Sequence, residues 1–250
     1  MGDKATTLAD KRDIVRYING EYIELRDLMV HEMTLHLNIV DVAYKTLYCS
    51  PSELPELVLG HLYTQRYIRR IADIETMDVD EETGIATVRL NTACANRIVT
   101  EDVPLSDKIV FDPEALLRNQ ERFYDESTLQ KATAGIHRSA LCSDQGTHLA
   151  CIDVSRHNTI DKVTGKALMN GISLHDKYII TSGRIPRDMI QKAVAIGIPM
   201  IVSRSTPTIA AVDVARKAGI TLLGFSRENR FNIYSAPYRL KGCPTDSLPK

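Results

Sequence analysis

The second half of the sequence alternates short apolar runs with stretches in which apolar residues recur at the helical period. Short apolar runs bounded by turn residues are typical of buried strands, and the periodic stretches between them predict amphipathic helices. The expected strands are residues 148–154, 178–181, 199–202, 221–225 and 231–234, and the expected helices are residues 159–169, 186–196 and 207–218. Gly197 and Gly219 follow two of these helices, where a glycine commonly ends a helix. This order of elements predicts an α/β fold with a mainly parallel sheet covered by helices.

The first half alternates apolar and polar residues with period two, which predicts strands with one buried face. Strands are expected at residues 33–39 and 43–49. Residues 74–80 and 85–90 are expected to form a hairpin that turns near Gly84. This half is therefore expected to be rich in β-structure.

Two helices are expected outside the alternating α/β region. One begins after Ser50-Pro51, and the other runs from Pro113 to about Tyr124. We therefore expect a smaller β-rich N-terminal subdomain over residues 1–110 and an α/β domain over residues 111–250.

Composition places the chain among ordinary globular proteins. Its 250 residues carry a formal net charge of −1, with 44% hydrophobic and 25% charged residues, which suits a chain with a buried core. The balanced charge argues against a nucleic-acid-binding protein. Five cysteines without a dense framework argue against a disulfide-stapled secreted scaffold. Because the sequence shows neither a signal peptide nor a membrane span, we expect a cytoplasmic protein with reduced thiols.

Arginines follow the expected strands of the α/β region, each near a hydroxyl residue. They are Arg156, Arg184, Arg204 and Arg227. In an open α/β sheet, ligands bind at the carboxyl ends of the strands, and arginine forks and helix N-termini both bind phosphate or carboxylate oxygens. The pattern predicts a crevice for a polyanionic ligand of dinucleotide size. The alternative is that Arg, Ser and Thr are simply common in loops and at helix caps.

Known phosphate and metal motifs are absent from the sequence. It contains neither the glycine-rich dinucleotide fingerprint nor the P-loop, and neither a C-x-x-C pair nor the zinc deaminase signature. His137 and His157 could ligate a metal, but structural histidines are the simpler interpretation. We expect no tightly bound metal.

Cys94 lies in a polar loop after the expected hairpin. An exposed thiol near Arg97 would have a lowered pKa and could be nucleophilic. The alternative is an incidental cysteine, because the sequence does not place a base beside it.

The second half contains the blocks TAGIHRSA at residues 133–140 and DVSRHNTIDK at residues 153–162. They are similar to T-G-G-x-H-x-A-A and D-V-G-R-H-N-A-x-D-K, two patterns of the formate dehydrogenase accessory sulfurtransferase family, FdhD, which this half of the chain resembles. The match continues through Ser182-Gly183-Arg184, Pro207-Thr208 and residues 222–230. In the first half the resemblance is looser, and Gly60-His61-Leu62 stands where the family has G-F-L.

The resemblance implies a cytidine-deaminase-like, three-layer α/β domain without zinc. It also implies a sulfur carrier that takes persulfide sulfur from a cysteine desulfurase and transfers it to the bis(molybdopterin guanine dinucleotide) cofactor of a formate dehydrogenase apoenzyme. Expected partners are these two proteins and the cofactor as cargo; a homodimer is left open. The residues expected to bind the cofactor are Phe225, Ser226, Arg227, Glu228, Asn229, Arg230, Arg156, His157, Arg184, Arg204, Thr206 and His137.

The sequence departs from the family at the sulfur-carrying thiol. The family usually has S-G-C-G-x-C-G, whereas this chain has Ala93-Cys94-Ala95-Asn96-Arg97, with one cysteine. A single thiolate can still carry a persulfide, so Cys94 is the expected sulfur acceptor. Two alternatives remain: a non-catalytic cofactor-binding chaperone in which Cys94 carries no sulfur, and a nucleotide-modifying enzyme that uses His137 or His157 as acid or base.

Overall fold

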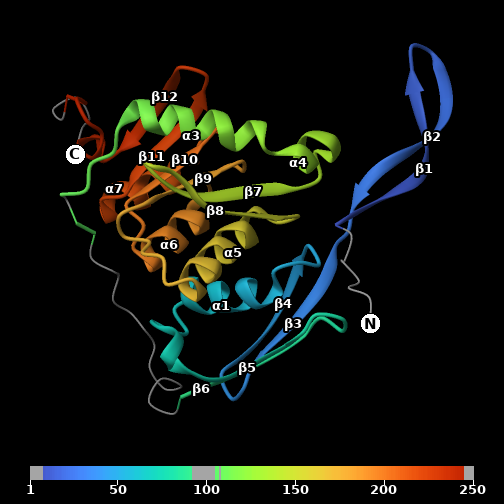
Figure 1. Ribbon diagram of the computed structural model, residues 1–250, viewed down its shortest axis with the longest axis horizontal. Coiled ribbons are helices and arrows are strands. Elements are labelled where there is room, and N and C mark those ends of the chain that lie inside the picture. Colours follow the sequence, from blue (N-terminus) through green and yellow to red (C-terminus); the bar gives the residue numbers. More distant parts are fainter. Residues whose placement is uncertain (1–7, 92–104, 107, 245–250) are drawn as a thin grey trace.

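The computed structural model describes residues 8–91, 105–106 and 108–244 (Figure 1). The strands of the N-terminal part are β1 (Ala9–Ile18), β2 (Glu21–Val30), β3 (Met33–Ile39), β4 (Ala43–Cys49), β5 (Ile74–Asp80) and β6 (Ile85–Leu90). Those of the C-terminal part are β7 (His137–Ser143), β8 (Gly146–Asp153), β9 (Tyr178–Thr181), β10 (Met200–Ser203), β11 (Thr221–Arg227) and β12 (Arg230–Ser235). The α-helices are α1 (Leu54–Thr64), α3 (Pro113–Asp125), α4 (Thr128–Thr133), α5 (Arg156–Met169), α6 (Arg187–Ile196) and α7 (Ile209–Ala218).

The described strands form three sheets. The β1–β2 hairpin projects from the body of the molecule (Figure 1). A four-stranded sheet has the order β4-β3-β6-β5, and a six-stranded sheet has the order β12-β11-β10-β9-β7-β8. No helix in the described ranges is both long enough and apolar enough to cross a membrane.

The helices lie in layers around the two larger sheets (Figure 1). Helix α3 covers one face of the six-stranded sheet, and α5, α6 and α7 cover the other. Helix α1 packs against α5 and separates it from the four-stranded sheet. Leu35 of β3, Leu57 of α1 and Ile179 of β9 are fully buried in one hydrophobic cluster. The two sheets therefore share a core.

Most of the expected elements are present. The strands expected at residues 33–39, 43–49, 74–80, 85–90 and 178–181 have those same bounds. Helices α6 and α7 end at Gly197 and Gly219, with φ angles of 66° and 68° that glycine adopts without strain. The expected division at residue 110 and the cytidine-deaminase-like fold stay predictions.

The expectation of a mainly parallel sheet is wrong, because the six-stranded sheet is mixed. Strands β9, β10 and β11 run parallel to one another, as the strand–helix alternation predicts. Strand β7 pairs antiparallel with both β8 and β9, and β12 pairs antiparallel with β11. The β7–β8 and β11–β12 connections are tight hairpins, which join antiparallel strands only.

The sequence patterns did not predict three of the strands, because the residues of these strands do not alternate clearly between apolar and polar. Strand β7 contains Arg138 and Ser139, which are buried although polar. Strands β1 and β2 expose large side chains on both faces; Tyr17 and Tyr22 are 64% and 78% exposed. A strand without one clearly apolar face gives no period-two signal.

Helices α1 and α5 cross with their backbones in close contact at two glycines. A Cβ atom on Gly60 would lie 1.7 Å from the carbonyl oxygen of Asp161, and one on Gly165 would lie 2.0 Å from that of Glu56. Glycine is therefore required at both positions. The crossing brings the last turn of α1 against the first half of α5, where the polar residues of the site lie.

A buried ion pair joins the end of β8 to the N-terminal part. Asp153 and Lys162 are fully buried, and their charged atoms are 2.7 Å apart. The same carboxylate accepts a hydrogen bond from the backbone N–H of Ser50, and the Ser50 hydroxyl accepts one from Val154 N–H. The start of α5 is thus fixed against the segment that leads into α1.

Candidate functional site

Four strand ends of the six-stranded sheet lie along one edge. Strands β9, β10 and β11 are parallel, and β8 has the same direction because both β8 and β9 pair antiparallel with β7. From β11 to β8 the sheet order covers four strand spacings, about 19 Å. The arginines that follow these strands, Arg156, Arg184, Arg204 and Arg227, are therefore brought to the same edge, which we call the arginine edge.

Hydrogen bonds join the segments that form the arginine edge. Ser203 donates from its hydroxyl to the Gly183 carbonyl at 2.7 Å, and Phe225 N–H donates to the Ser205 carbonyl at 3.3 Å. Ser182 N–H donates to the Arg138 carbonyl at 2.9 Å, and the Ser182 hydroxyl accepts from Arg138 N–H. The connections after β9, β10 and β11 are thus held to one another and to β7.

At the β8 end of the edge, the side chains of His137 and Arg156 both lie against Gly183. A Cβ atom on Gly183 would be 2.9 Å from Arg156 Cβ and 3.4 Å from His137 Nδ1. Burial, followed by the nearby Arg156 guanidinium, lowers the pKa of His137. The buried Nε of Arg156 has no hydrogen-bond partner among the described residues. Buried guanidinium groups usually find an acceptor, so this end has an unused donor.

At the other end, Arg204 and Arg227 lie over aromatic rings. The guanidinium of Arg204 is 5.1 Å from the centre of the Tyr124 ring, and that of Arg227 is 5.4 Å from the Phe225 ring. Burial raises the pKa of Tyr124 to about 12, so its hydroxyl stays uncharged. This hydroxyl accepts a hydrogen bond from the backbone N–H of Arg204. Ring contacts restrict arginine side chains while leaving their N–H groups available.

The segment from Phe225 to Arg230 turns sharply. Phe225 and Glu228 have left-handed φ angles of 52° and 47°, which cost energy for residues other than glycine. The Ser226 side chain is buried and its hydroxyl donates to Gln120, so it points away from the edge. Residues 227–230 are exposed.

The remaining expected residues have different settings. Arg184 and Thr206 are exposed in the connections that lead to α6 and α7. Cys94, the expected sulfur acceptor, lies outside the described residues. Within the described part of the chain, no group of three or more His, Cys, Asp or Glu side chains is placed to hold a metal ion.

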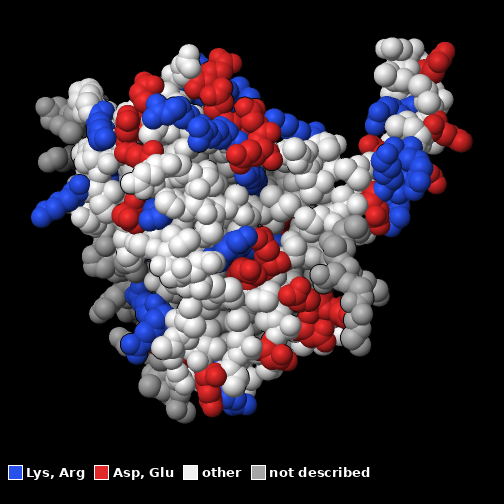
Figure 2. Space-filling view, viewed as in Figure 1, with Lys and Arg blue, Asp and Glu red and all other residues white. Residues whose placement is uncertain are grey.

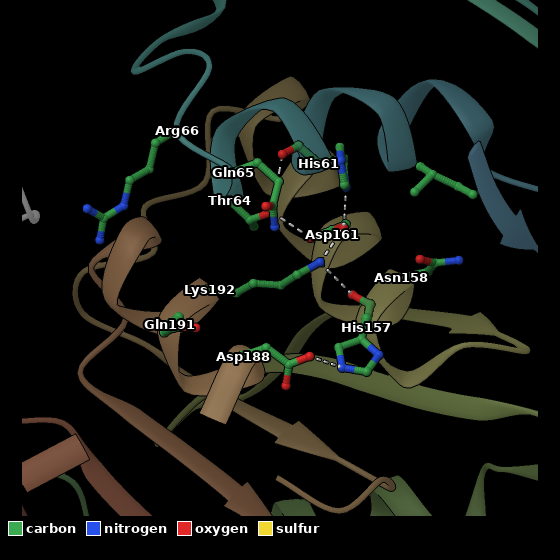
Figure 3. A pocket seen from close by; sticks show the side chains of 11 residues that line it. His61, Thr64, Gln65, Arg66, His157, Asn158, Asp161, Asp188, Gln191 and Lys192 are labelled. Atoms are coloured by element: carbon green, nitrogen blue, oxygen red, sulfur yellow. Dashed lines mark hydrogen bonds and ion pairs between the residues drawn. The ribbon is translucent and has the colours of Figure 1, made fainter. Parts of the chain in front are cut away.

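A polar pocket of about 560 Å³ lies between α1, α5 and α6 (Figure 3). At its centre, Asp161 is fully buried and accepts hydrogen bonds from Lys192 Nζ at 2.6 Å, Thr64 Oγ1 at 2.7 Å and His61 Nδ1 at 3.2 Å. Burial would raise the pKa of Asp161, but the Lys192 ammonium and the hydrogen bonds from His61 outweigh it and hold the pKa at about 2. The carboxylate is therefore ionised.

His157 connects the pocket to the arginine edge. It follows Arg156 in sequence and lines the pocket, and its Nε2 lies 2.7 Å from a carboxylate oxygen of Asp188. The sequence analysis selected His157 but missed His61, Asp161 and Lys192. One signal was available: Asp161 follows His157 by four residues, which places both on one face of α5.

Charge is mixed over the rest of the visible surface. On the face shown in Figure 2, Lys and Arg side chains are interspersed with Asp and Glu side chains. That face has no broad basic patch of the kind that binds nucleic acid.

Comparison with known proteins identifies the family. The model of the FdhD/NarQ family matches residues 30–241. The chain is 33% identical to the sulfur carrier protein FdhD of Bacillus subtilis (strain 168), over 96% of this chain and 100% of that protein. It is 30% identical to the sulfur carrier protein FdhD of Geobacillus kaustophilus (strain HTA426), over 93% of this chain and 97% of that protein.

A solved structure has the same fold. It is the crystal structure of a proposed formate dehydrogenase accessory protein from Desulfotalea psychrophila, with a TM-score of 0.82 and 27% sequence identity. The match covers 94% of this chain and 100% of that one. From the family model, the relatives and the fold together, the chain belongs to the FdhD/NarQ family.

Proposed function

We propose that this protein is a sulfur carrier in formate dehydrogenase maturation, which takes sulfur from a cysteine desulfurase and transfers it to bis(molybdopterin guanine dinucleotide). The cofactor is its cargo and the formate dehydrogenase apoenzyme its client. The observation that carries the proposal is the arginine edge, which extends for about 19 Å along four strand ends. The relatives named sulfur carrier protein FdhD support the part of the proposal in which this protein carries sulfur.

The arginine edge suits a long ligand with several phosphates. Arg227 and Arg230 lie at one end, and Arg156 with its unpartnered buried Nε lies at the other. Guanidinium groups bind phosphate oxygens through paired N–H donors, and each such charge-assisted bond is stronger than a neutral one. A dinucleotide cofactor has phosphate groups separated by ring systems, which matches arginines that are spread out rather than clustered.

Sulfur transfer is assigned to Cys94. Its thiolate attacks the outer sulfur of the donor persulfide, the donor's S–S bond breaks, and the donor cysteine leaves as a thiolate. In the transfer to the cofactor the S–S bond of the Cys94 persulfide breaks, Cys94 is released as a thiolate, and the outer sulfur is reduced to a sulfide by two electrons from the reduced metal of the cofactor, to which it binds. The three buried cysteines suit this role less well, because burial raises the pKa of Cys49 to about 12 and that of Cys142 to about 11, and also raises that of Cys151.

Intact-mass analysis after incubation with a cysteine desulfurase and free cysteine tests the proposal. We expect the protein to gain the mass of one sulfur atom, and the Cys94→Ala variant to gain none. Cys243→Ala is the matched control, because Cys243 is half-buried in the C-terminal segment and is expected to be irrelevant. Retention of the sulfur by Cys94→Ala would overturn the assignment.

A second candidate is a cofactor-binding chaperone without sulfur transfer. The single cysteine in the 93–97 segment favours it, because a resolving thiol is missing. Its signature would be binding of guanine nucleotide with no sulfur adduct on any cysteine.

A further inference from the structure

The C-terminal part of helix α3 contacts two segments of the arginine edge. Gln120 accepts a hydrogen bond from the Ser226 hydroxyl, and the Tyr124 hydroxyl accepts one from the backbone N–H of Arg204 at 3.1 Å. Gln120 and Tyr124 are four residues apart, which places them on the same face of α3. One face of this helix therefore supports both the connection after β10 and the turn after β11.

Tyr124 contacts Arg204 at two places, the backbone and the end of the side chain. Besides the hydrogen bond to the backbone N–H, the guanidinium of Arg204 lies 5.1 Å from the centre of the Tyr124 ring. Arg204 is otherwise exposed. A free arginine side chain loses much conformational freedom when it binds a ligand, and a contact that restricts it beforehand lowers that cost. The ring contact therefore prepares Arg204 for binding.

The phenol of Tyr124 holds the guanidinium without neutralising it. Burial raises the pKa of Tyr124 to about 12, although the hydrogen bond from Arg204 and the positive charges of Arg204 and Arg227 act in the opposite direction. The hydroxyl is therefore uncharged at neutral pH. Neither Arg204 nor Arg227 forms an ion pair with another residue that the structure describes. Both positive charges are thus available to an anionic ligand.

A second arginine at the same end of α3 shows the contrast. Arg138 of β7 is buried and its guanidinium lies 4.9 Å from the centre of the Phe123 ring. It donates hydrogen bonds to the Phe123 carbonyl at 2.5 Å and to the Glu126 carboxylate at 3.0 Å. The charge of Arg138 is therefore used inside the protein, where it fixes the end of α3 to the sheet. This fixes the position of Tyr124 as well.

We propose that Tyr124 is a positioning residue of the arginine edge, which holds the Arg204 guanidinium in place to bind a phosphate oxygen of the ligand. The inference rests on the proposed function, because a phosphorylated cargo is assigned there. Tyr124 acts through Arg204 and not by contact with the ligand. An aromatic ring suits this role better than a carboxylate, since a carboxylate would pair with the guanidinium and compete with the phosphate.

Calorimetric titration with guanosine diphosphate tests the role of the ring. Tyr124→Leu removes the ring beneath Arg204 and should weaken binding about two- to fivefold, the range for the loss of a cation–π contact at an exposed site. Tyr124→Phe keeps the ring, loses only the hydroxyl, and should retain most of the affinity. Unchanged affinity in Tyr124→Leu would overturn the inference.

A double-mutant cycle with Arg204→Ala separates positioning from a general structural effect. If Tyr124 acts through Arg204, Tyr124→Leu should weaken binding in the unmodified protein and cause no further loss in the Arg204→Ala variant. A structural effect of the leucine would weaken binding in both backgrounds by the same factor. That second result would overturn the inference.

Phe123→Leu is the matched control for the loss of an aromatic ring from α3. Phe123 is the neighbouring residue, but its ring is 1% exposed and lies against Arg138 instead of Arg204. The variant should lower the urea concentration at the midpoint of unfolding and leave the affinity for guanosine diphosphate unchanged. Equal weakening of binding in Phe123→Leu and Tyr124→Leu would point to displacement of the helix and overturn the inference.

The arginine variants distinguish failure of this inference from failure of the proposed function. If Arg204→Ala and Arg227→Ala weaken binding of guanosine diphosphate while Tyr124→Leu does not, the inference fails and the arginine edge stands. If the diphosphate does not bind, or binds with the same affinity in both arginine variants, the arginine edge fails and the inference fails with it.

Discussion

The backbone of Gly60 in α1 lies directly against the backbone carbonyl of Asp161 in α5, so close that a side chain at position 60 would overlap with that carbonyl. This contact places His61 and Thr64 within hydrogen-bond reach of the Asp161 carboxylate. The polar pocket therefore depends on the absence of a side chain one residue before His61.

Gly60→Ala is expected to destabilise the protein strongly. The added methyl group would lie 1.7 Å from a backbone oxygen, so α1 and α5 must move apart, at a cost of about 1–3 kcal/mol or more. Urea denaturation measures the change. Gly135→Ala is a milder control, because the nearest atom to its methyl group would be a side-chain carbon of Val30 at 3.2 Å, and the nearest backbone atom would be at 3.8 Å. Equal stability of the two variants would contradict the close contact between the backbones of α1 and α5 at Gly60.

The arginine edge makes a prediction for nucleotide binding. Arg227→Ala and Arg230→Ala should each weaken binding of guanosine diphosphate by about 1.5–3 kcal/mol, the range for a lost hydrogen bond to a charged group. Isothermal titration at low salt measures it. Lys217→Ala, an exposed cation on α7, should leave the affinity unchanged. Unchanged affinity in both arginine variants would show that residues 227–230 do not take part in nucleotide binding.

Acid should weaken the fold through Asp161. The folded state lowers the pKa of this carboxyl from 3.8 to about 2, so its contribution is complete above about pH 4 and is lost as the pH falls toward 2. The shift corresponds to about 2 kcal/mol of unfolding free energy. The urea concentration at the midpoint of unfolding should fall as the pH is lowered from 4 to 2. This fall should be smaller in the Asp161→Asn variant than in the unmodified protein.

Thiol reactivity should separate the cysteines. Burial raises the pKa of the Cys49, Cys142 and Cys151 thiols, so few thiolates form and reagents cannot reach them. Iodoacetamide labelling of the native protein at pH 8, followed by peptide mapping, should leave these three unlabelled. Labelling in denaturant should reach all five cysteines. Rapid native labelling of Cys151 would show that the core around it opens.

Sequence patterns found the elements that have one buried face, such as β3, β4 and the β5–β6 hairpin. They failed where burial and polarity disagree: Arg138 lies buried in β7, and Tyr17 and Tyr22 are exposed in the hairpin. They also missed β7, which pairs antiparallel between β8 and β9, and gave no direction for β12, which pairs antiparallel with β11. Local pattern therefore described each element better than it described the sheet as a whole.

The arginine edge could be anticipated because strand direction alone brings strand ends together. The pocket could not, since His61, Asp161 and Lys192 come from three helices that meet only after folding. Nothing in their spacing relates position 61 to position 192.

The core shared by the two larger sheets has a consequence for a chain cut into two pieces. Leu35 and Leu57 belong to the N-terminal piece, and Ile179 to the C-terminal one, yet all three are buried in the same cluster. Each fragment alone would expose its half of that apolar surface to water. Two co-expressed fragments divided near residue 110 should therefore associate into one complex in which this apolar surface is buried again.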